Sequence, residues 1–388
     1  MRDAVMDFIS LSHDVEQRNQ ARQIALDKLF GLTHWTQVTT GRNGLQRVTQ
    51  GSELPPGPGF DSLQEAFEAF SGDPDVLRLG RRITQGYSTF DFPKALGNTL
   101  NNVLLKAYRE VDYHLQDIVT STTVAADFRG LERTRIKAMG DLEELGEDAP
   151  YEEVGNSGDE GYSFAVATWG GFLTVTRHAV LANNVLGVQR AVEQLARAAA
   201  RTLAKRCWDK VISNRAYGVD DLAIFHTDHG NLGAAPLSVA ALNAARLAMF
   251  AQTEPGSDER LGLSGPFFLV VPVELEGVAR GINSCMYVPG SETFEANPWY
   301  QRFGVGGERI FANPLFTDTD DWCLFDTSGK VGILEIAFLL GKQNPTIQIA
   351  DDPREGATFS QDRVTYRVRH EYEVAIEDYR GAYKAVVT

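Results

Sequence analysis

The sequence has few cysteines, no long apolar run and a deficit of basic residues. Cys207, Cys285 and Cys323 are its only cysteines, too few and too widely spaced for a disulfide framework or a zinc cluster. No apolar run approaches the ~20 residues that a membrane helix needs, and residues 1–14 lack the basic start and apolar run of a signal peptide. The sequence therefore predicts a protein that is made in a reducing cytosol and does not enter a membrane.

Acidic residues exceed basic ones, with 52 Asp and Glu against 37 Lys and Arg and a net charge of −15 at pH 7. Proteins that bind nucleic acid over a broad surface usually carry a basic patch or a high pI, so this balance argues against that class. The chain has 388 residues, 43% of them hydrophobic, which is enough to bury a core without disulfides or metals. The acidic balance favours solubility and cationic partners.

Two segments show the apolar periodicity of helices. Pro93 stands at a first-turn position that proline tolerates, and the apolar face that follows runs from Leu96 to Val111. Residues 178–213 carry a longer stripe, in which apolar side chains recur every three or four positions. Its members are Val188, Val192, Leu195, Ala199, Leu203, Cys207 and Val211. Each stripe predicts a helix with one face against a core.

An acidic stretch lies between these two predicted helices. Residues 141–160 contain nine acids and no Lys or Arg. Arg133 and Arg135 precede the stretch, and residues 162–177 alternate in the manner of a strand. The pattern predicts a two-stranded excursion over residues 129–175 with an acidic tip.

The rest of the chain mixes strand and helix patterns without an internal repeat. Short apolar or alternating runs predict strands at residues 265–272, within 321–340 and at 363–376. Helical patterns cover residues 1–30, 61–70, 236–252 and 273–283. Residues 31–60 hold several glycines and prolines, which indicate a loop.

The segment HTDHGN (226–231) is the strongest candidate for chemistry. Imidazole and carboxylate groups suit zinc or iron, so His226, Asp228 and His229 could serve a metal-dependent hydrolase. Such a site needs a further ligand, and the neighbouring sequence marks none. The alternative is a structural loop of His226, His229, Gly230 and Asn231, with hydrogen-bonded histidines and an unusual backbone angle at the glycine.

Other motifs of catalysis or ion binding fail in the sequence. The acidic runs 141–160 and 317–321 lack the ligand order of an EF-hand. FGVGGER (303–309) does not have the spacing of a dinucleotide-binding loop, and no G-x-S-x-G elbow is present. The sequence therefore predicts no enzyme, no cofactor and no bound metal.

An ordered set of motifs runs from residue 81 to residue 384. It opens with RRITQGYSTFDFPKALGNTLNNVLLKAY (81–108), whose characteristic residues are Ser88, Asp91, Phe92, Pro93, Leu96 and Asn98. The later members are GDLEEL (140–145), FLTVTRHAVLANNVLGV (172–188) with Arg177 and Asn184, LAIFHTDHGNL (222–232), residues 237–248, FFLVVPVELEGVA (267–279) and EDYRGAYK (377–384). The set resembles the major capsid proteins of tailed bacteriophages with the Hong Kong 97 fold, in the branch shared with Mu-like head subunits and protease-linked capsid genes.

The resemblance implies an α+β fold with an N-terminal arm, an extended β-hairpin loop, a peripheral domain with a long spine helix, and an axial domain. It also implies that HTDHGN is a structural loop. The implied divisions are 1–80 (a retained arm, or a scaffolding-like segment that a prohead protease removes), 81–128 (arm and helix leading into the peripheral domain), 129–175 (extended loop), 176–221 (spine helix of the peripheral domain), 222–350 (axial domain) and 351–388 (return strands of the peripheral domain).

The function that the resemblance implies is structural. Relatives assemble as pentamers and hexamers, in the cytoplasm of the host bacterium, into an icosahedral shell that becomes part of the virion. The implied partners are other copies of the chain, a portal protein, packaged double-stranded DNA bound without sequence specificity and, in some relatives, a scaffold, a prohead protease or a decoration protein. An encapsulin-type compartment of the same fold is the alternative.

The charge pattern predicts how copies of the chain meet. Acids of the extended loop are expected to contact arginines of an adjacent subunit, a contact that sets register more than affinity. The acids are Glu143, Glu144, Glu147, Asp148, Glu152 and Glu153, and the candidate arginines are Arg133, Arg135, Arg197 and Arg201. Some relatives join subunits through a Lys–Asn isopeptide bond that forms from this loop. Residues 138–176 contain no lysine, so the sequence predicts no such crosslink.

Overall fold

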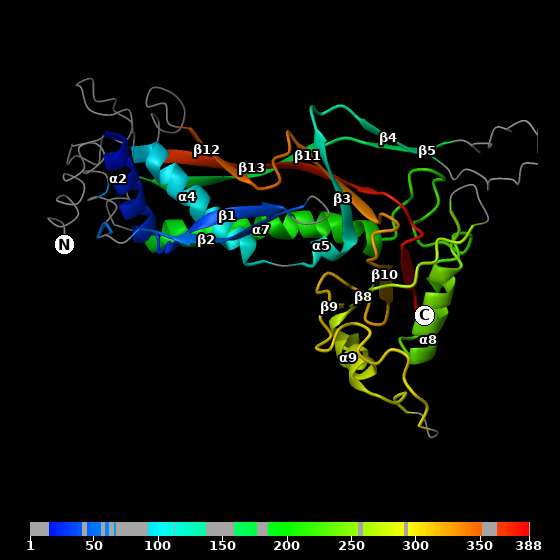
Figure 1. The fold of residues 1–388 in the computed structure, drawn as a ribbon. Coiled ribbons are helices and arrows are strands. Elements are labelled where there is room, and N and C mark those ends of the chain that lie inside the picture. Colours follow the sequence, from blue (N-terminus) through cyan, green and yellow to red (C-terminus); the bar gives the residue numbers. More distant parts are fainter. Residues whose placement is uncertain are drawn as a thin grey trace, which may run out of the picture. The chain divides into compact units, whose positions relative to one another are not determined.

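The computed structural model describes residues 15–40, 45–55, 59–61, 66, 92–111, 113–136, 159–176, 185–254, 259–290, 294–350 and 363–387. The chain forms two compact units, each assembled from segments that are far apart in the sequence. Unit 1 comprises Met1–Asp112, Ala167–Leu203 and Lys342–Tyr372, and unit 2 comprises Tyr113–Val166, Ala204–Gly341 and Glu373–Thr388. Helices and strands occur in both units (Figure 1), which confirms the predicted α+β class.

Three helices supply much of the core of unit 1: α2 (Val15–Leu29), α4 (Phe92–Arg109) and the first part of α7 (Val185–Ile212). The apolar face predicted for α4 is buried from Leu96 to Ala107, whereas Val111 lies beyond the helix and is partly buried. Pro93 lies in the first turn of α4, where its missing N–H would have no helical partner in any case. The described part of the predicted first helix is therefore integral to this core rather than a separate arm.

The helix α7 confirms the longest helical prediction, although residues 178–184 of that prediction lie outside the described residues. In unit 1 its buried stripe is Val188, Val192, Ala196, Ala200 and Leu203. Leu195, which the sequence pattern favoured, is partly buried and packs against the same core, and Ala199 is partly buried. None of the helices in the described ranges is both long and apolar enough to cross a membrane.

Three antiparallel strands of a five-stranded sheet cover the core of unit 1. β12 (Thr346–Ala350) and β6 (Ala167–Thr176) pair with the two edges of β13 (Arg363–Ile376). Tyr366 and Val368 of β13 are buried in the cluster that α4 and α7 form. Gly170 allows β6 to approach closely, since a Cβ there would lie 2.6 Å from the Val368 carbonyl oxygen.

Unit 1 also contains an antiparallel pair of strands, β1 (His34–Thr40) and β2 (Gln46–Glu53). The prediction of a loop over residues 31–60 is therefore wrong for residues 34–40 and 46–53. Gly51 lies within β2 rather than in a turn. The threonine and valine residues of the segment favour strand, and this preference outweighs the glycines that the sequence pattern weighted most.

The first part of unit 2 holds the base of the predicted excursion. β4 (Leu131–Ile136) and β5 (Asp159–Phe164) pair in antiparallel register, and the acidic tip lies outside the described residues. The arm predicted after the tip is divided, because β6 pairs with β13 and not with β4. Before this hairpin in the sequence, α5 (Leu115–Ile118) is followed directly by β3 (Val119–Ala125). β3 pairs in parallel with β11 (Leu334–Leu339).

A five-stranded sheet forms the core of the rest of unit 2. Its order is β7 (Leu232–Gly233), β14 (Ala382–Ala385), β10 (Trp322–Asp326), β8 (Phe267–Val271) and β9 (Ile310–Ala312). The helices are α8 (Val239–Phe250), the 3₁₀ turn η2 (Val273–Leu275) and α9 (Glu276–Ser284). Every residue of β8 and β10 is buried, which confirms the prediction of core strands from short apolar runs.

The division into units differs from the divisions drawn on the sequence. α7 passes from unit 1 to unit 2 after Leu203, and β13 passes after Tyr372. β14, which the sequence grouped with the return strands of the peripheral domain, pairs with β10 and β7 in unit 2. All four residues of β14 are buried, and a single sequence gives no signal for which of two sheets such a strand joins.

Candidate functional site

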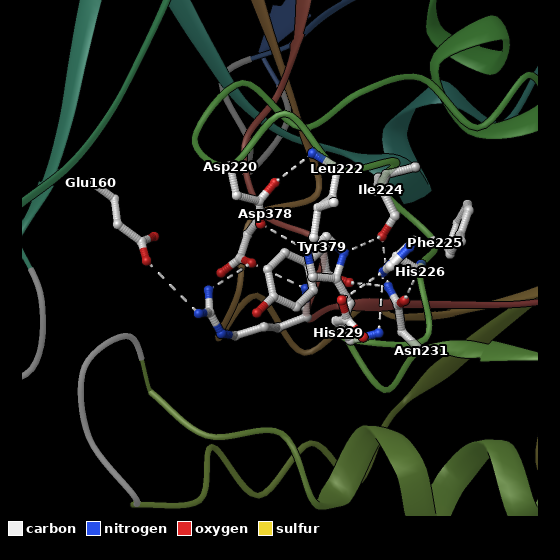
Figure 2. Close-up of polar contacts among 12 residues, drawn as sticks. Glu160, Asp220, Leu222, Ile224, Phe225, His226, His229, Asn231, Asp378 and Tyr379 are labelled. Carbon is white, nitrogen blue, oxygen red and sulfur yellow. Dashed lines mark hydrogen bonds and ion pairs between the residues drawn. The ribbon is translucent and has the colours of Figure 1, made fainter.

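The loop of residues 220–231 and the closing segment 377–384 meet in unit 2 (Figure 2). The His229 ring stacks on the Tyr379 ring, with centroids 3.7 Å apart and planes 9° apart. Tyr217 packs edge-on against both rings. Two motifs that are far apart in the sequence, LAIFHTDHGNL and EDYRGAYK, therefore form one packed site.

Asn231 joins the two segments by hydrogen bonds. It is almost fully buried, and its Nδ2 donates to the carbonyl oxygens of Ile224 at 2.9 Å and Tyr379 at 3.2 Å. Its Oδ1 accepts from the backbone N–H of His226 at 3.1 Å, and its own carbonyl accepts from the Lys384 N–H at 3.0 Å. A single amide side chain thus fixes the loop against the closing segment.

Gly230 has a φ of +64°, in the left-handed region that glycine adopts without strain. This confirms the unusual backbone angle predicted there. The turn also exposes the His229 carbonyl to Gln252, whose Nε2 donates to it at 2.8 Å.

The geometry does not gather His226, Asp228 and His229 as metal ligands. Both ring nitrogens of His229 face acceptors, with Nε2 2.8 Å from Asp220 Oδ2 and Nδ1 3.2 Å from the Ile224 carbonyl oxygen. A coordinating nitrogen must present a lone pair to the ion, and neither nitrogen of His229 does so. His226 Nδ1 accepts from the backbone N–H of Asp228 at 3.2 Å. These contacts support the structural-loop alternative.

Among the described residues, one group of three potential metal ligands lies close enough together to share an ion. It consists of Asp318, Asp320 and Asp321. Asp321 is already engaged, because its Oδ2 lies 3.1 Å from Lys384 Nζ and its Oδ1 accepts from the Val387 N–H. Asp318 Oδ1 accepts from the Asp320 N–H in a surface turn. We assign no metal to this turn.

A buried ion pair extends the site toward the hairpin (Figure 2). Asp378 is fully buried and accepts from the backbone N–H of Arg380 at 3.0 Å and from its Nη1 at 3.1 Å. The Arg380 guanidinium lies over the Tyr379 ring, 4.6 Å from its centroid, and 3.9 Å from Glu160 Oε1. Glu160 belongs to β5, so the contact links the closing segment to the base of the hairpin.

A second polar cluster holds the hairpin against β11 in unit 2. Glu335 is buried, and Arg133 donates to it through Nε at 2.9 Å and Nη2 at 2.6 Å. The Tyr162 hydroxyl donates at 2.8 Å, and the Thr123 hydroxyl also donates. Burial opposes ionisation of Glu335, but these hydrogen bonds outweigh it and lower its pKa. The hydrogen bond to Glu335 in turn raises the pKa of Arg133.

The residues predicted for assembly have different surroundings. The six acids Glu143, Glu144, Glu147, Asp148, Glu152 and Glu153 lie outside the described residues. Arg133 is bound to Glu335 of its own chain, and Arg135 stands opposite Glu160 in the register of β4 and β5. Arg197 Nη2 lies 3.6 Å from Glu110 Oε2, and Arg201 is exposed on α7. Their contacts with an adjacent subunit stay a prediction.

The sequence missed Asp220, Glu160 and Glu335. No local pattern marks a basic partner for any of these acids, and only the fold brings each of them to a histidine or an arginine. Tyr379 and Arg380 were marked by the motif EDYRGAYK alone, not by any local chemical pattern.

Several solved structures are similar to the chain. One is a virus-like particle from Pyrococcus furiosus, at 11% identity and a TM-score of 0.40, over 75% of this chain and 99% of that chain. Another is from Mycobacterium phage Patience, at 10% identity and a TM-score of 0.45, over 77% and 89%. A third is the procapsid of bacteriophage JBD30, at 14% identity and a TM-score of 0.37, over 76% of each chain. The TM-scores are low, so the family assignment depends on sequence.

No curated protein matches the chain by sequence. The sequence model of one family, described as phage capsid protein, matches residues 160–385, which is more than half of the chain. The matched region contains α7, the loop of residues 220–231 and the closing segment that stacks on it. The chain therefore belongs to the phage capsid protein family.

Proposed function

We propose that the chain is the major capsid protein of a tailed, double-stranded DNA phage with the Hong Kong 97 fold. In this role it assembles as pentamers and hexamers into the icosahedral shell of the virion. The family match over residues 160–385 carries the proposal. The stacked site supports a structural role, because the polar side-chain groups of His229 and Asn231 form hydrogen bonds with other residues of the same chain.

The anatomy follows from this function. Unit 1 corresponds to the peripheral domain and α7 to its spine helix, while the five-stranded sheet of unit 2 corresponds to the axial domain. β4 and β5 form the base of the extended loop. This correspondence is supported by the hairpin register and by the length of α7. The Mu-like branch stays a prediction.

We also propose that residues 15–60 remain in the mature subunit. Their side chains Leu26, Phe30, Leu54 and Phe60 are buried in the same cluster as α4 and α7. Removing them would expose that apolar surface, at about 25 cal/mol per Å². A segment that a protease removes is not expected to form part of the core of the remaining domain. Peptide mapping of purified particles shows whether residues 15–60 are retained.

Electron microscopy and light scattering of the purified chain test the function. Closed shells, or rings of five or six subunits, would support it. A uniform monomer that persists when scaffold and protease genes are co-expressed would contradict it. The encapsulin alternative predicts shells that enclose a protein cargo, so the nucleic-acid and protein content of particles from infected cells separates the two.

A further inference from the structure

The part of α7 that lies in unit 1 presents arginines to solvent. Its exposed positions include Arg190, Gln194, Arg197 and Arg201, which recur every three or four residues and so share one helical face. The opposite face is buried in the core of unit 1. From Arg190 to Arg201 this face, which we call the arginine stripe, runs for about 16 Å at the helical rise.

The neighbouring charges leave the stripe cationic. Glu110, just after α4, forms an ion pair with Arg197, but about half of each side chain is exposed and such pairs are weak. The other nearby acid, Glu193, is partly buried and accepts a hydrogen bond from Gln189. Three arginines thus accompany two acids, one of them turned toward Gln189, in a chain of net charge −15.

We propose that the arginine stripe faces the packaged DNA and contacts its phosphates without reading sequence. The inference rests on the proposed capsid function, because the inner wall of a shell lies against a polyanion. A chain of net charge −15 is repelled by DNA as a whole, so contact with phosphates is favoured only at a local cationic surface such as the stripe. On this proposal, the exposed side of α7 belongs to the inner surface of the shell.

The dimensions fit a weak, sequence-independent contact. Each strand of a DNA duplex carries one phosphate per ~3.4 Å of axis. The stripe therefore lies along about five phosphates of one strand and offers three arginines to them. Such a contact is strongly salt-dependent and allows DNA to slide during packaging.

An acidic segment of a neighbouring copy, the partner that the sequence predicts for Arg197 and Arg201, fits the stripe less well. The cores of protein–protein interfaces are apolar and poor in charge. The exposed positions from Arg190 to Arg201 are arginine and glutamine, and an exposed apolar side chain, Leu186, stands only at the start of α7, one turn before Arg190. Phosphate contacts, in contrast, are made by just these polar and cationic groups.

The test compares two double variants of the full chain. Arg197→Gln/Arg201→Gln removes two charges from the stripe. Arg129→Gln/Arg280→Gln is the matched control, because it removes two exposed arginines of unit 2, which pair with Asp127 and Glu276. Capsomers of each are titrated against a fluorescent duplex of about 30 base pairs over a series of salt concentrations, with anisotropy as the readout.

We expect the slope of log affinity against log salt to fall in magnitude by about 2 in the stripe variant, at ~0.9 per lost contact, and to change little in the control. The variant Arg197→Lys/Arg201→Lys keeps the charge and should keep the slope, which separates charge from misfolding. Equal slopes in the two Gln variants would overturn the proposal. So would a stripe variant that binds DNA normally but forms no shells, since that outcome favours the neighbouring copy. Shells formed by the unmodified chain test the capsid function separately.

Discussion

The Thr99 hydroxyl of α4 donates a 2.7 Å hydrogen bond to Asp27 Oδ1 of α2, and both residues are almost fully buried. Gln23 Nε2 donates to the same two oxygens, at 3.0 Å to Asp27 and 2.8 Å to Thr99. This small network ties the N-terminal helix to the core of unit 1. It is the polar counterpart of the apolar cluster that the two helices share.

Thr99→Val should therefore loosen α2. The substitution keeps the shape but leaves a buried carboxylate without its shortest hydrogen bond, which should lower the free energy of unfolding by about 2 kcal/mol. Urea denaturation of unassembled subunits measures the loss. Thr99→Ser retains the hydroxyl and is the matched control. A Val variant as stable as the Ser variant would show that the hydrogen bond does not hold α2.

Arg133→Ala should weaken the base of the hairpin. It removes the guanidinium that donates twice to Glu335 and leaves that buried carboxylate with only the Tyr162 and Thr123 hydroxyls. Breaking a fully buried pair costs about 3–5 kcal/mol. Because a third of the Arg133 side chain is exposed, we expect about 2 kcal/mol. Thermal unfolding of the subunit measures the loss.

The control for this pair is Arg133→Ala combined with Glu335→Gln. Removing the charge at residue 335 should recover part of the loss, whereas additive losses would show that the two side chains are not coupled. The pH dependence gives a second readout. The pKa of Glu335 is lowered from its ordinary 4.5, so its stabilising contribution is present above that value and is lost as the pH falls through the lowered pKa.

Most regular elements of the described chain could be predicted from its sequence, because burial on one face leaves a periodic pattern. α4, α7, β8 and β13 lie where the periodicity places them. β1 and β2 were missed, since their polar and glycine-containing segments carry no apolar alternation.

The site was predicted only in part. The histidine loop could be identified as a motif, but its partners could not. Asp220 precedes the loop without any marked pattern, and Tyr379 lies at the other end of unit 2 in the sequence. Contacts of this kind depend on which strands pair. A single sequence shows the local preference for helix or strand but not which strands pair.

His370 should make the subunit sensitive to mild acid. The ring is buried against Tyr108 and Tyr372, and Nε2 donates to the Gln343 carbonyl at 2.8 Å. Burial lowers the pKa of His370 from 6.5 to about 4. The unfolded chain thus binds the proton more readily, and stability is lost as the pH falls from about 6.5 toward 4.

The expected loss from His370 at pH 5 is about 2 kcal/mol relative to neutral pH. His370→Gln retains a donor for Gln343 but does not titrate, so its urea midpoint should change less between pH 7 and pH 5. The comparison uses the change with pH in each protein, because the variant also loses ring packing. Parallel changes in the two proteins would show that His370 does not control the response.

Mature particles should contain no covalent Lys–Asn crosslink from the extended loop. Residues 138–176 provide no lysine for the bond, and the last lysine before them in the sequence is Lys137. Cohesion must then come from large, non-covalent interfaces. Particles boiled in detergent should run as single subunits on a denaturing gel, and ladders of higher mass would contradict this.

Glu152→Lys/Glu153→Lys should impair assembly while leaving the subunit folded. The acidic stretch that includes both residues has no basic residue of its own, so charges of opposite sign on a neighbouring copy would set its register. Reversal replaces attraction with repulsion, and electron microscopy should show far fewer closed shells. Glu152→Gln/Glu153→Gln should give an intermediate yield, and raised salt should narrow the differences by screening. Normal shells from the Lys variant, at low salt and with an unchanged melting temperature, would reject an electrostatic role for these two acids.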